Sequence, residues 1–351
     1  MPHNREAVPV NTSDPLPLPF PIGRPIIGAP MAGGPSTPDL VAAVTNTGGM
    51  GFLAGGYKNP QQLAAQITAT RTLTQGPIGV NLFVVSANDV DEDELEAYRQ
   101  ELQPEADRYG IQVGSPSWDD DFWSGKLEVI HDLRPDVVSF TFGCPDMDVL
   151  HELAQAGIST AVTVTSTAEA RTAAERGVQI LIVQGPDAGG HRATFDPAAE
   201  PGTDPLPQLI RAIRNAVELP VIAGGGISTR EQVRAILDTG ATAVQLGTAL
   251  LLADEAGTNP AHRSALQDPA FTETKITRAF TGRPARGLRN RFMDDHPRSG
   301  HAYPQIHYIT APLRAAAAAS NDLQGLHLWA GTGYRNTRTG AAADIIEDLT
   351  P

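Results

Sequence analysis

The sequence is poor in cysteine and aromatic residues and has no long hydrophobic stretch. Cys144 is the single cysteine among 351 residues, which excludes an intrachain disulfide and argues against a zinc–thiolate centre. No run of about 18 apolar residues is present, so no hydrophobic transmembrane helix is predicted. Residues 1–21 lack the cationic start and apolar core of a secretory signal, and we expect a cytoplasmic protein.

Basic residues are also fewer than acidic residues. Lysine and arginine total 26 residues against 40 aspartates and glutamates, which gives a formal net charge of −14. A chain of this sign is repelled by nucleic acid and by anionic membrane surfaces, so we expect neither as a partner. Hydrophobic residues make up 41% of the chain, which is ordinary for a globular protein with a large core. We expect a small-molecule partner, and the oligomeric state stays open.

Eight short apolar segments alternate with segments of helical pattern. Segments that are apolar on both faces are typical of a parallel sheet covered by helices. Eight such repeats match the (β/α)8 TIM barrel, an α/β fold of about 250 residues, although an open doubly wound sheet gives the same periodicity. The predicted strands are residues 25–31, 50–54, 78–83, 136–142, 159–164, 179–183, 220–224 and 242–247.

Several helical segments begin at Ser, Thr or Asn and end at Gly, as capping chemistry predicts. The predicted helices are residues 37–49, 59–73, 93–110, 149–157, 167–177, 206–217 and 228–240. We expect an N-terminal arm over residues 1–21, a barrel over residues 22–253 and a C-terminal extension over residues 254–351. An inserted helical segment lies between residues 83 and 135, and the alanine-rich run 311–320 predicts a helix in the extension.

Glycine clusters follow the last two predicted strands. "AGGGIST" (223–229) ends the seventh strand, and "QLGTALL" (245–251) ends the eighth. Glycines at a helix N-terminus expose backbone N–H groups to an anion. In TIM barrels the loops after strands seven and eight are the usual phosphate site. The two clusters therefore favour a closed barrel and predict a phosphate-binding site at its C-terminal end.

The segment "QGPDAGGHRATF" (184–195) leaves the sixth predicted strand with few side chains and then presents His191. A tight turn is one explanation. The other is that a flat or phosphorylated ligand approaches the backbone there, with the imidazole directed at it.

Six segments, taken together, resemble class I of the nitronate monooxygenase family, the FMN-dependent group formerly called 2-nitropropane dioxygenases. The resemblance runs in order from about residue 22 to residue 335. It implies non-covalently bound FMN, no metal, and oxidation of alkyl nitronates such as propionate 3-nitronate by O₂ to a carbonyl compound plus nitrite or nitrate. The segments are residues 25–57, 80–83, 184–192, 220–227, 243–251 and 275–290.

The resemblance also implies which residues hold FMN and makes residues 22–253 the FMN-binding barrel. Asn81 and Gln184 are expected to end strands and offer amides that both donate and accept hydrogen bonds, the alternative being that each caps its strand. Gln245 is either a cofactor contact or a satisfied core amide, and Met31 is either a flavin contact or a gap-filling core residue. The full expected set is Pro30, Met31, Ala32, Asn81, Gln184, Gly189, Gly190, Gly225, Gly226, Gln245, Leu246, Gly247 and Thr248.

His191 is the candidate catalytic residue. The resemblance places it on the substrate face of the flavin, where an imidazole either donates to the nitronate oxygens or removes a proton from a neutral nitroalkane. The resemblance also implies that the extension packs on the barrel and covers the substrate pocket. Tyr303 and His307, in "HAYPQIHY" (301–308), are then expected to line that pocket, the alternative being ordinary packing of the extension.

The arginine-rich run over residues 278–291 is expected to pair with carboxylates or backbone carbonyls and to fix the extension. Two other functions remain open at this point. One is an FMN-dependent NAD(P)H:quinone or enoyl reductase on the same barrel, although no G-x-G-x-x-G follows a predicted strand. The other is a non-enzymatic binding protein, which the clustering of polar residues at strand C-termini disfavours.

Overall fold

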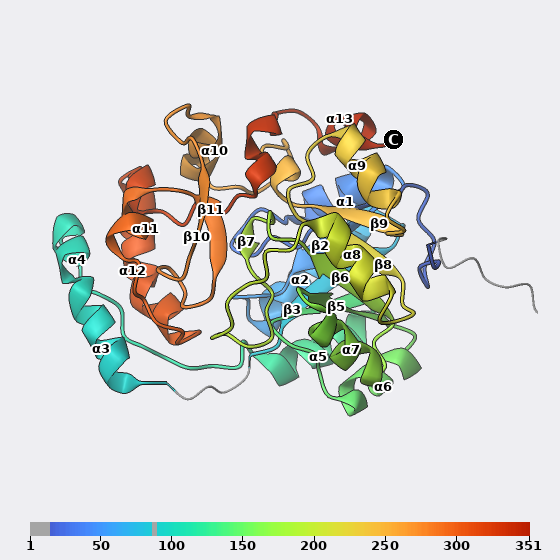
Figure 1. Ribbon diagram of the computed structural model, residues 1–351, viewed down its shortest axis with the longest axis horizontal. Helices are drawn as coiled ribbons and strands as arrows, with labels where there is room; N and C mark the ends of the chain where they lie inside the picture. Colours follow the sequence, from blue (N-terminus) through green and yellow to red (C-terminus); the bar gives the residue numbers. More distant parts are fainter. Residues whose placement is uncertain (1–14, 86–89) are drawn as a thin grey trace, which may run out of the picture.

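The computed structural model of the chain describes residues 15–85 and 90–351, and its central feature is a closed barrel of eight parallel strands (Figure 1). The ring closes because the first strand pairs with the last, with Ile27 opposite Gln245. This confirms the TIM barrel and excludes the open doubly wound sheet. The barrel strands are β1 (Ile26–Gly28), β2 (Met50–Ala54), β3 (Ile78–Phe83), β4 (Val137–Thr141), β5 (Ser159–Val164), β6 (Ile180–Gln184), β8 (Val221–Gly224) and β9 (Ala243–Leu246).

Alternate residues of each strand face two separate cores. Ile27, Phe52 and Ile182 belong to the cluster that fills the barrel, and Phe20 joins this cluster from the segment that precedes β1. Their strand neighbours, such as Leu53, belong to the larger cluster between the strands and the surrounding helices. Because both faces are covered, the strands are apolar throughout, and this is why all eight could be predicted from the sequence.

Helices that alternate with the strands cover the outside of the barrel. The side chains of Thr37, Asn59, Ser166 and Thr229 each accept a hydrogen bond from the first turn of a helix, as the capping pattern predicts. The sequence pattern did not predict α5, which has no side-chain cap. These helices are α1 (Pro38–Asn46), α2 (Pro60–Leu73), α5 (Trp123–Leu133), α6 (Met147–Gln155), α7 (Thr167–Glu175), α8 (Leu206–Arg214) and α9 (Arg230–Leu237).

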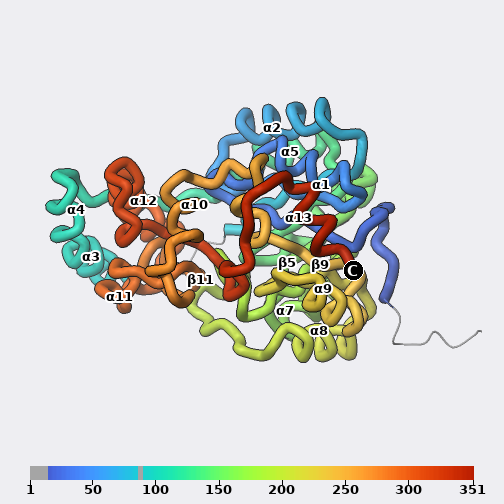
Figure 2. The backbone as a smooth tube through the Cα atoms, turned by 90° about the horizontal axis from the view of Figure 1, so that it is seen from above, coloured from blue at the N-terminus to red at the C-terminus, as the bar shows by residue number. Residues whose placement is uncertain are grey.

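A second lobe lies beside the barrel and combines two distant parts of the chain (Figures 1 and 2). The inserted segment forms α3 (Glu92–Glu101) and α4 (Gln103–Tyr109), two helices where the pattern predicted one. They pack on α12 (Gln305–Ala319) and α11 (Arg291–Asp295), and the four helices share a core that includes Tyr98, Phe292 and Ile309. The helix predicted over residues 311–320 is the C-terminal part of α12, which begins earlier, at Gln305.

A three-stranded antiparallel sheet connects the lobe to the barrel. Its strands are β7 (Gly190–His191), β11 (Ala285–Leu288) and β10 (Thr274–Thr277), with β11 in the middle. Ala285 pairs with His191, so the extension holds the turn that follows β6. The remaining elements of the extension are α10 (Pro260–Gln267), α13 (Ala342–Leu349) and the short helices η2 (Leu323–Gly325) and η3 (Thr332–Asn336), and another short helix, η1 (Thr248–Leu250), directly follows β9. The last of the helices, α13, returns to pack on α1.

The arginine-rich run fixes the extension as predicted. Arg278 donates to the backbone oxygens of Pro197 and Ala199, and Arg283 donates to that of Thr194. The other three bond to the backbone of Pro186 or pair with carboxylates; they are Arg286, Arg289 and Arg291.

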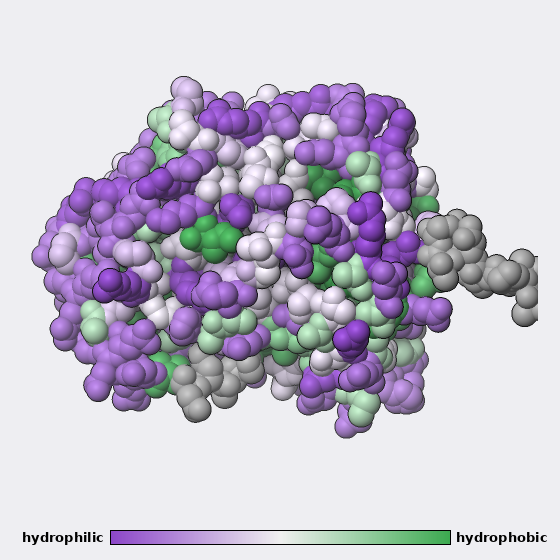
Figure 3. All heavy atoms as spheres, in the orientation of Figure 1, coloured by the Kyte–Doolittle hydropathy of each residue, from purple (hydrophilic) through white to green (hydrophobic). Residues whose placement is uncertain are grey.

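Hydrophilic residues dominate the face of the molecule in Figure 3. In the part of the chain that the structure describes, no helix combines the length and apolarity needed to cross a membrane.

Candidate active site

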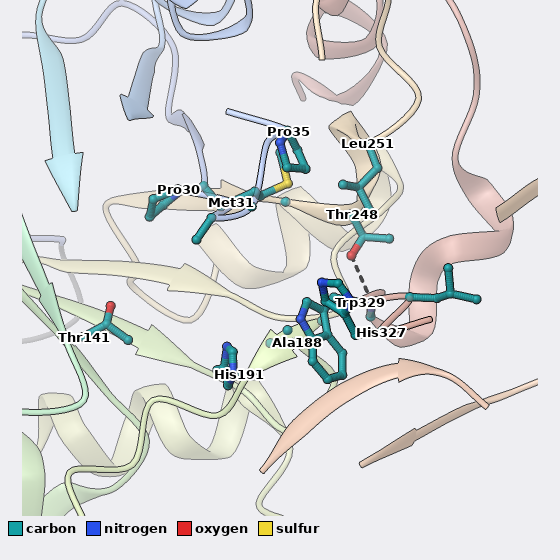
Figure 4. Close-up of a pocket in the computed structure, with 18 of the residues that line it drawn as sticks. Pro30, Met31, Pro35, Thr141, Ala188, His191, Thr248, Leu251, His327 and Trp329 are labelled. Atoms are coloured by element: carbon teal, nitrogen blue, oxygen red, sulfur yellow. Dashed lines mark hydrogen bonds between the residues drawn. The ribbon is translucent and has the colours of Figure 1, made fainter. Parts of the chain in front are cut away.

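A cavity of about 590 Å³ lies at the C-terminal ends of the barrel strands, and the extension forms its far side (Figure 4). Strand ends and the loops after them supply one part of its wall, and α10, α12 and residues 326–333 supply most of the rest. Most residues expected at the site line this cavity. They are Pro30, Met31, Ala32, Asn81, Gln184, Gly189, Gly190, His191, Gly225, Gly226, Gln245, Gly247, Thr248 and His307.

Two expected residues do not line the cavity. Leu246 belongs to the cluster between strands and helices, because Gln245 faces inward and its neighbour must face outward. Tyr303 lies one layer behind the wall, where its hydroxyl donates to the Tyr57 hydroxyl at 3.4 Å and its ring meets the edge of Phe142. Its effect on a ligand is therefore through the residues that it supports.

Glycine-rich backbone from three loops forms one end of the cavity. Gly226 has φ +73°, and a Cβ there would lie 2.6 Å from the Asp187 Cβ, so only glycine fits. Gly247 lies at the end of β9. The extension adds "GTG" (331–333), whose Gly331 N–H donates to the Thr248 hydroxyl at 2.9 Å. The backbone N–H groups of Gly226, Ile227 and Gly247 donate to no other described residue, so they remain available to an anion.

The N-terminus of α9 contributes less to this end than the sequence predicted. The helix begins at Arg230, and its capping box already occupies the flanking donors. The Gln232 Oε1 atom accepts from the N–H groups of Ser228 and Thr229. The free donors are therefore those of the glycine loop, one turn before the helix.

Three amide side chains reach the barrel end of the cavity with different amounts of free hydrogen-bonding capacity. The Asn81 Nδ2 donates to Ser139 and Thr141, which leaves Oδ1 as its free acceptor. Gln184 is used internally: its Nε2 donates to the His191 carbonyl, and its Oε1 accepts from the Ala193 N–H. The buried Nε2 of Gln245 has no partner among the described residues. An unpartnered buried amide is costly, so Gln245 is suited to a ligand that accepts hydrogen bonds.

The cavity is bounded by two walls. Pro30 and Met31, in the loop after β1, lie on one side, and His191 and Trp329 lie on the other (Figure 4). The first wall is fixed by the Met31 N–H, which donates to the Ser36 hydroxyl at 2.8 Å. A slot between an apolar wall and an aromatic wall suits a flat ring system.

His191 is held from several directions. β11 pairs with its backbone, and Gln184 bonds its carbonyl. The Nε2 atom lies 2.9 Å from the Thr281 hydroxyl. The ring meets those of Phe142 and Trp329 at centroid distances of 5.5 and 5.6 Å. The "PDAGG" turn thus delivers one imidazole, in a fixed orientation, to the cavity wall.

The imidazole of His191 is neutral. Burial against protein, followed by repulsion from Arg283 and Arg314, lowers its pKa to about 3. Burial likewise lowers the pKa of His307 to about 3 and that of His262 to about 4, and it lowers the pKa of His327 further. All four histidines line the cavity, and none carries charge near neutral pH.

These depressed pKa values predict acid lability. Between the ordinary histidine pKa and the lowered ones, the unfolded chain binds more protons than the folded chain, so the stability falls as the pH falls below about 6.5. Each histidine adds a slope of up to about 1.4 kcal/mol per pH unit. Asp121 and His296 act in the opposite sense, because their pKa values are raised.

Chemical denaturation between pH 7 and pH 5 measures this slope. The matched variant is His307→Phe, which keeps a ring stacked on Tyr57 and removes one titrating group. We expect the variant to have the shallower pH dependence. Equal slopes for the two proteins would contradict the assignment of a depressed pKa to His307.

Several residues of the cavity wall were not predicted. Trp329, Tyr57, Thr281 and Arg314 all line it. Tyr57 and Thr281 lie in segments 25–57 and 275–290, which carry the family resemblance, but no site role was assigned to them, and Trp329 and Arg314 lie in no such segment. Arg314 lies within an alanine-rich helical run, whose only sequence signal is for a helix. The "GTG" of residues 331–333 was the one detectable signal, since it repeats the glycine pattern of the predicted phosphate site.

Among residues 15–85 and 90–351, no group of three or more His, Cys, Asp or Glu side chains is arranged to hold a metal ion.

Comparisons with known proteins agree over nearly the whole chain. The family model described as nitronate monooxygenase matches residues 20–351. A probable nitronate monooxygenase of Bacillus subtilis is 34% identical over 90% of this chain and 92% of its own length. The crystal structure of nitroalkane oxidase from Streptomyces ansochromogenes superposes with a TM-score of 0.91 at 44% identity, covering 93% of this chain and 95% of that one. FabK from Thermotoga maritima superposes with a TM-score of 0.72 at 26% identity, covering 93% and 92%.

Proposed function

The chain belongs to the nitronate monooxygenase family of oxidoreductases, and from this premise we propose that it binds FMN in the cavity and oxidises alkyl nitronates with O₂. Propionate 3-nitronate is a representative substrate, and the products are a carbonyl compound plus nitrite or nitrate. The observation that carries the proposal is one cavity with a glycine-lined anion cradle, a flat slot and a neutral histidine.

The residues present fit FMN at both ends of the molecule. The free N–H groups of Gly226, Ile227 and Gly247 suit a phosphate, and these are the two loops at which TIM barrels usually bind one. Gln245 offers an unpartnered Nε2 and Asn81 a free Oδ1, a donor and an acceptor for the polar edge of a flavin ring. Pro30, Met31 and Ala32 would cover one face of the ring, and the turn over residues 189–190 and Thr248 would complete the enclosure.

When bound, FMN supplies the redox chemistry, accepting electrons and passing them to oxygen. The protein's task is to bind the nitronate, orient it and stabilise its charge. A neutral imidazole has one N–H, and the position of this proton decides what His191 can do. The Thr281 hydroxyl lies 2.9 Å from Nε2 and 3.4 Å from its other acceptor, the Arg283 carbonyl. A hydroxyl that donates to Nε2 leaves the proton on Nδ1, available to the nitronate oxygens.

This arrangement supports hydrogen-bond donation by His191 over proton abstraction. A base with a pKa of about 3 is far too weak to remove a carbon-bound proton from a neutral nitroalkane near neutral pH. A nitronate is already deprotonated and needs no base. We therefore assign nitronates, and not neutral nitroalkanes, as the substrates.

Spectroscopy of the purified protein tests the proposal. We expect bound flavin, which denaturation releases as FMN, and rapid anaerobic bleaching of the flavin spectrum on mixing with ethyl nitronate. Mixing with NADPH should leave the spectrum unchanged, and ethyl nitronate should stimulate O₂ uptake. Bleaching by NADPH alone would favour the reductase alternative, and a colourless protein that cannot be loaded with FMN would exclude both enzymes.

A further inference from the structure

Arg314 is the one residue with a permanent charge among the described residues that line the cavity. No aspartate, glutamate or lysine accompanies it there, and the four histidines are neutral. The cavity is therefore locally cationic in a chain whose net charge is −14.

The guanidinium of Arg314 is anchored but not neutralised. Its Nε donates to the Thr310 hydroxyl at 3.2 Å, and its Nη2 donates to the His307 carbonyl at 2.8 Å. In the described part of the chain, Nη1 makes no hydrogen bond, and no carboxylate lies within 4.0 Å of the group. Every hydrogen bond that the described residues make to the group comes from α12 itself, so the helix presents the arginine in a fixed geometry.

Arg314 belongs to the His191 side of the cavity and not to the glycine cradle. Its partner His307 stacks on Tyr57 with ring centroids 4.3 Å apart. Tyr57 contacts Phe83 edge-on and bonds Tyr303, whose ring is 6.2 Å from that of His191. These aromatic residues therefore link the arginine to the face where His191 is placed.

Arg314 is only partly exposed, at the cavity wall. A cation that is largely removed from water and has no counterion is destabilising, and proteins retain one mainly where a ligand supplies the charge. The neighbouring phenols do not compensate, because burial raises the pKa of Tyr57 to about 12 and raises that of Tyr303 as well. Arg283 is buried, but it donates to the Thr194 carbonyl and lies 4.0 Å over the Phe142 ring. Among the described arginines, only Arg314 combines a place on the cavity wall with a free donor.

We infer that Arg314 binds the anionic oxygens of the nitronate through Nη1 and so selects the nitronate over its neutral nitroalkane. This inference rests on the proposed function, since it names the group that recognises the proposed substrate. A charge-assisted hydrogen bond from a fixed arginine distinguishes two molecules that differ by one proton and are otherwise alike in size.

The test compares Arg314→Gln and Arg314→Lys with the wild-type holoenzyme. We expect Arg314→Gln to raise the KM for ethyl nitronate about 10- to 100-fold with a smaller change in kcat, because a charged partner of the ground state is lost. Inhibition by neutral nitroethane should change less than about twofold, the range expected when no charge interaction is removed. Arg314→Lys should recover part of the loss. The matched control is Arg335→Gln, which removes an exposed cation of η3 that donates to the Phe271 carbonyl.

Nitrite titration separates this inference from the proposed function. Nitrite is a small oxyanion, and its binding perturbs a nearby flavin spectrum whether or not nitronates are turned over. We expect binding to the wild type that Arg314→Gln weakens and Arg335→Gln does not. Equal nitrite affinities in the wild type and Arg314→Gln, or no nitrite binding to the wild type, would overturn the role of Arg314. A KM effect confined to nitronates that carry an additional carboxylate would overturn its assignment to the nitronate oxygens. An unchanged flavin content and melting temperature exclude a general folding defect.

Discussion

Gly247→Asp should give a folded protein that no longer retains flavin. Gly247 has φ −110°, outside the left-handed region that favours glycine, and a Cβ there would first meet the Ala29 Cβ at 3.4 Å, an ordinary contact. The aspartate side chain therefore fits the chain but places a carboxylate in the proposed phosphate cradle. Juxtaposed like charges cost about 3 kcal/mol or more, which corresponds to a loss of affinity of about 100-fold or more.

Gly247→Ala is the matched control, since it adds the same Cβ without the charge. We expect Gly247→Ala to purify with flavin and Gly247→Asp to purify without it, with similar circular dichroism and melting temperatures for the two apo-proteins. Flavin content is measured by absorbance after gel filtration. Gly226 is less suitable for this experiment, because its positive φ and the nearby Asp187 side chain strain any substitution. Equal flavin retention by the two Gly247 variants would remove the phosphate from this loop.

The barrel could be predicted because its signals are local. Each strand is apolar on both faces, and several helices begin after an N-cap residue such as Thr37 or Asn59 that is recognisable in the sequence. The second lobe could not be predicted in the same way, because its core joins α3 and α4 to helices nearly two hundred positions later in the chain. No periodicity in one segment indicates which distant segment will cover it.

The residues of the candidate site also differ in whether a local sequence pattern indicates them. Gln184 and Gln245 are polar residues at or next to the ends of apolar strands, a pattern that the sequence displays directly. Asn81 was expected to end its strand, but it lies within β3 and is followed there by Leu82 and Phe83. Leu246 shows the limit of a motif, since its neighbours line the cavity and it does not. Arg314 gave no signal at all, because its importance lies in the absence of a carboxylate around it, and an absence of partners is a property of the folded molecule.

The neutral state of His191 also required the structure. A histidine in a glycine-rich turn has an ordinary pKa until its surroundings are known, and so the sequence left donor and base open. The contacts with Phe142 and Trp329 remove water from the imidazole, and the charges of Arg283 and Arg314 repel a proton. The neutral state that results favours the donor role.

His191→Phe should slow anaerobic flavin reduction by ethyl nitronate about 10²- to 10³-fold, the usual cost of removing one preorganised donor. Phenylalanine keeps an aromatic ring between Phe142 and Trp329 and removes both imidazole nitrogens, so the wall is preserved and bound flavin should be unchanged. Stopped-flow spectroscopy measures the rate. A wild-type rate of reduction in His191→Phe would remove the donor role and leave His191 as part of the cavity wall.

Thr281→Val distinguishes a donor from a base at the same position. It replaces the hydroxyl that bonds Nε2 with a methyl group of similar size and leaves the imidazole in place. Without that bond the Nδ1 proton is no longer favoured, and we expect reduction by ethyl nitronate to slow about tenfold, the value of one hydrogen bond. A base would instead act on neutral nitroethane, which should reduce the flavin of neither the wild type nor Thr281→Val. If fresh nitroethane reduces the wild-type flavin faster than it ionises in buffer, His191 or a neighbour removes the proton. In that case the pKa of His191 in the complex must lie well above its value of about 3 in the free cavity.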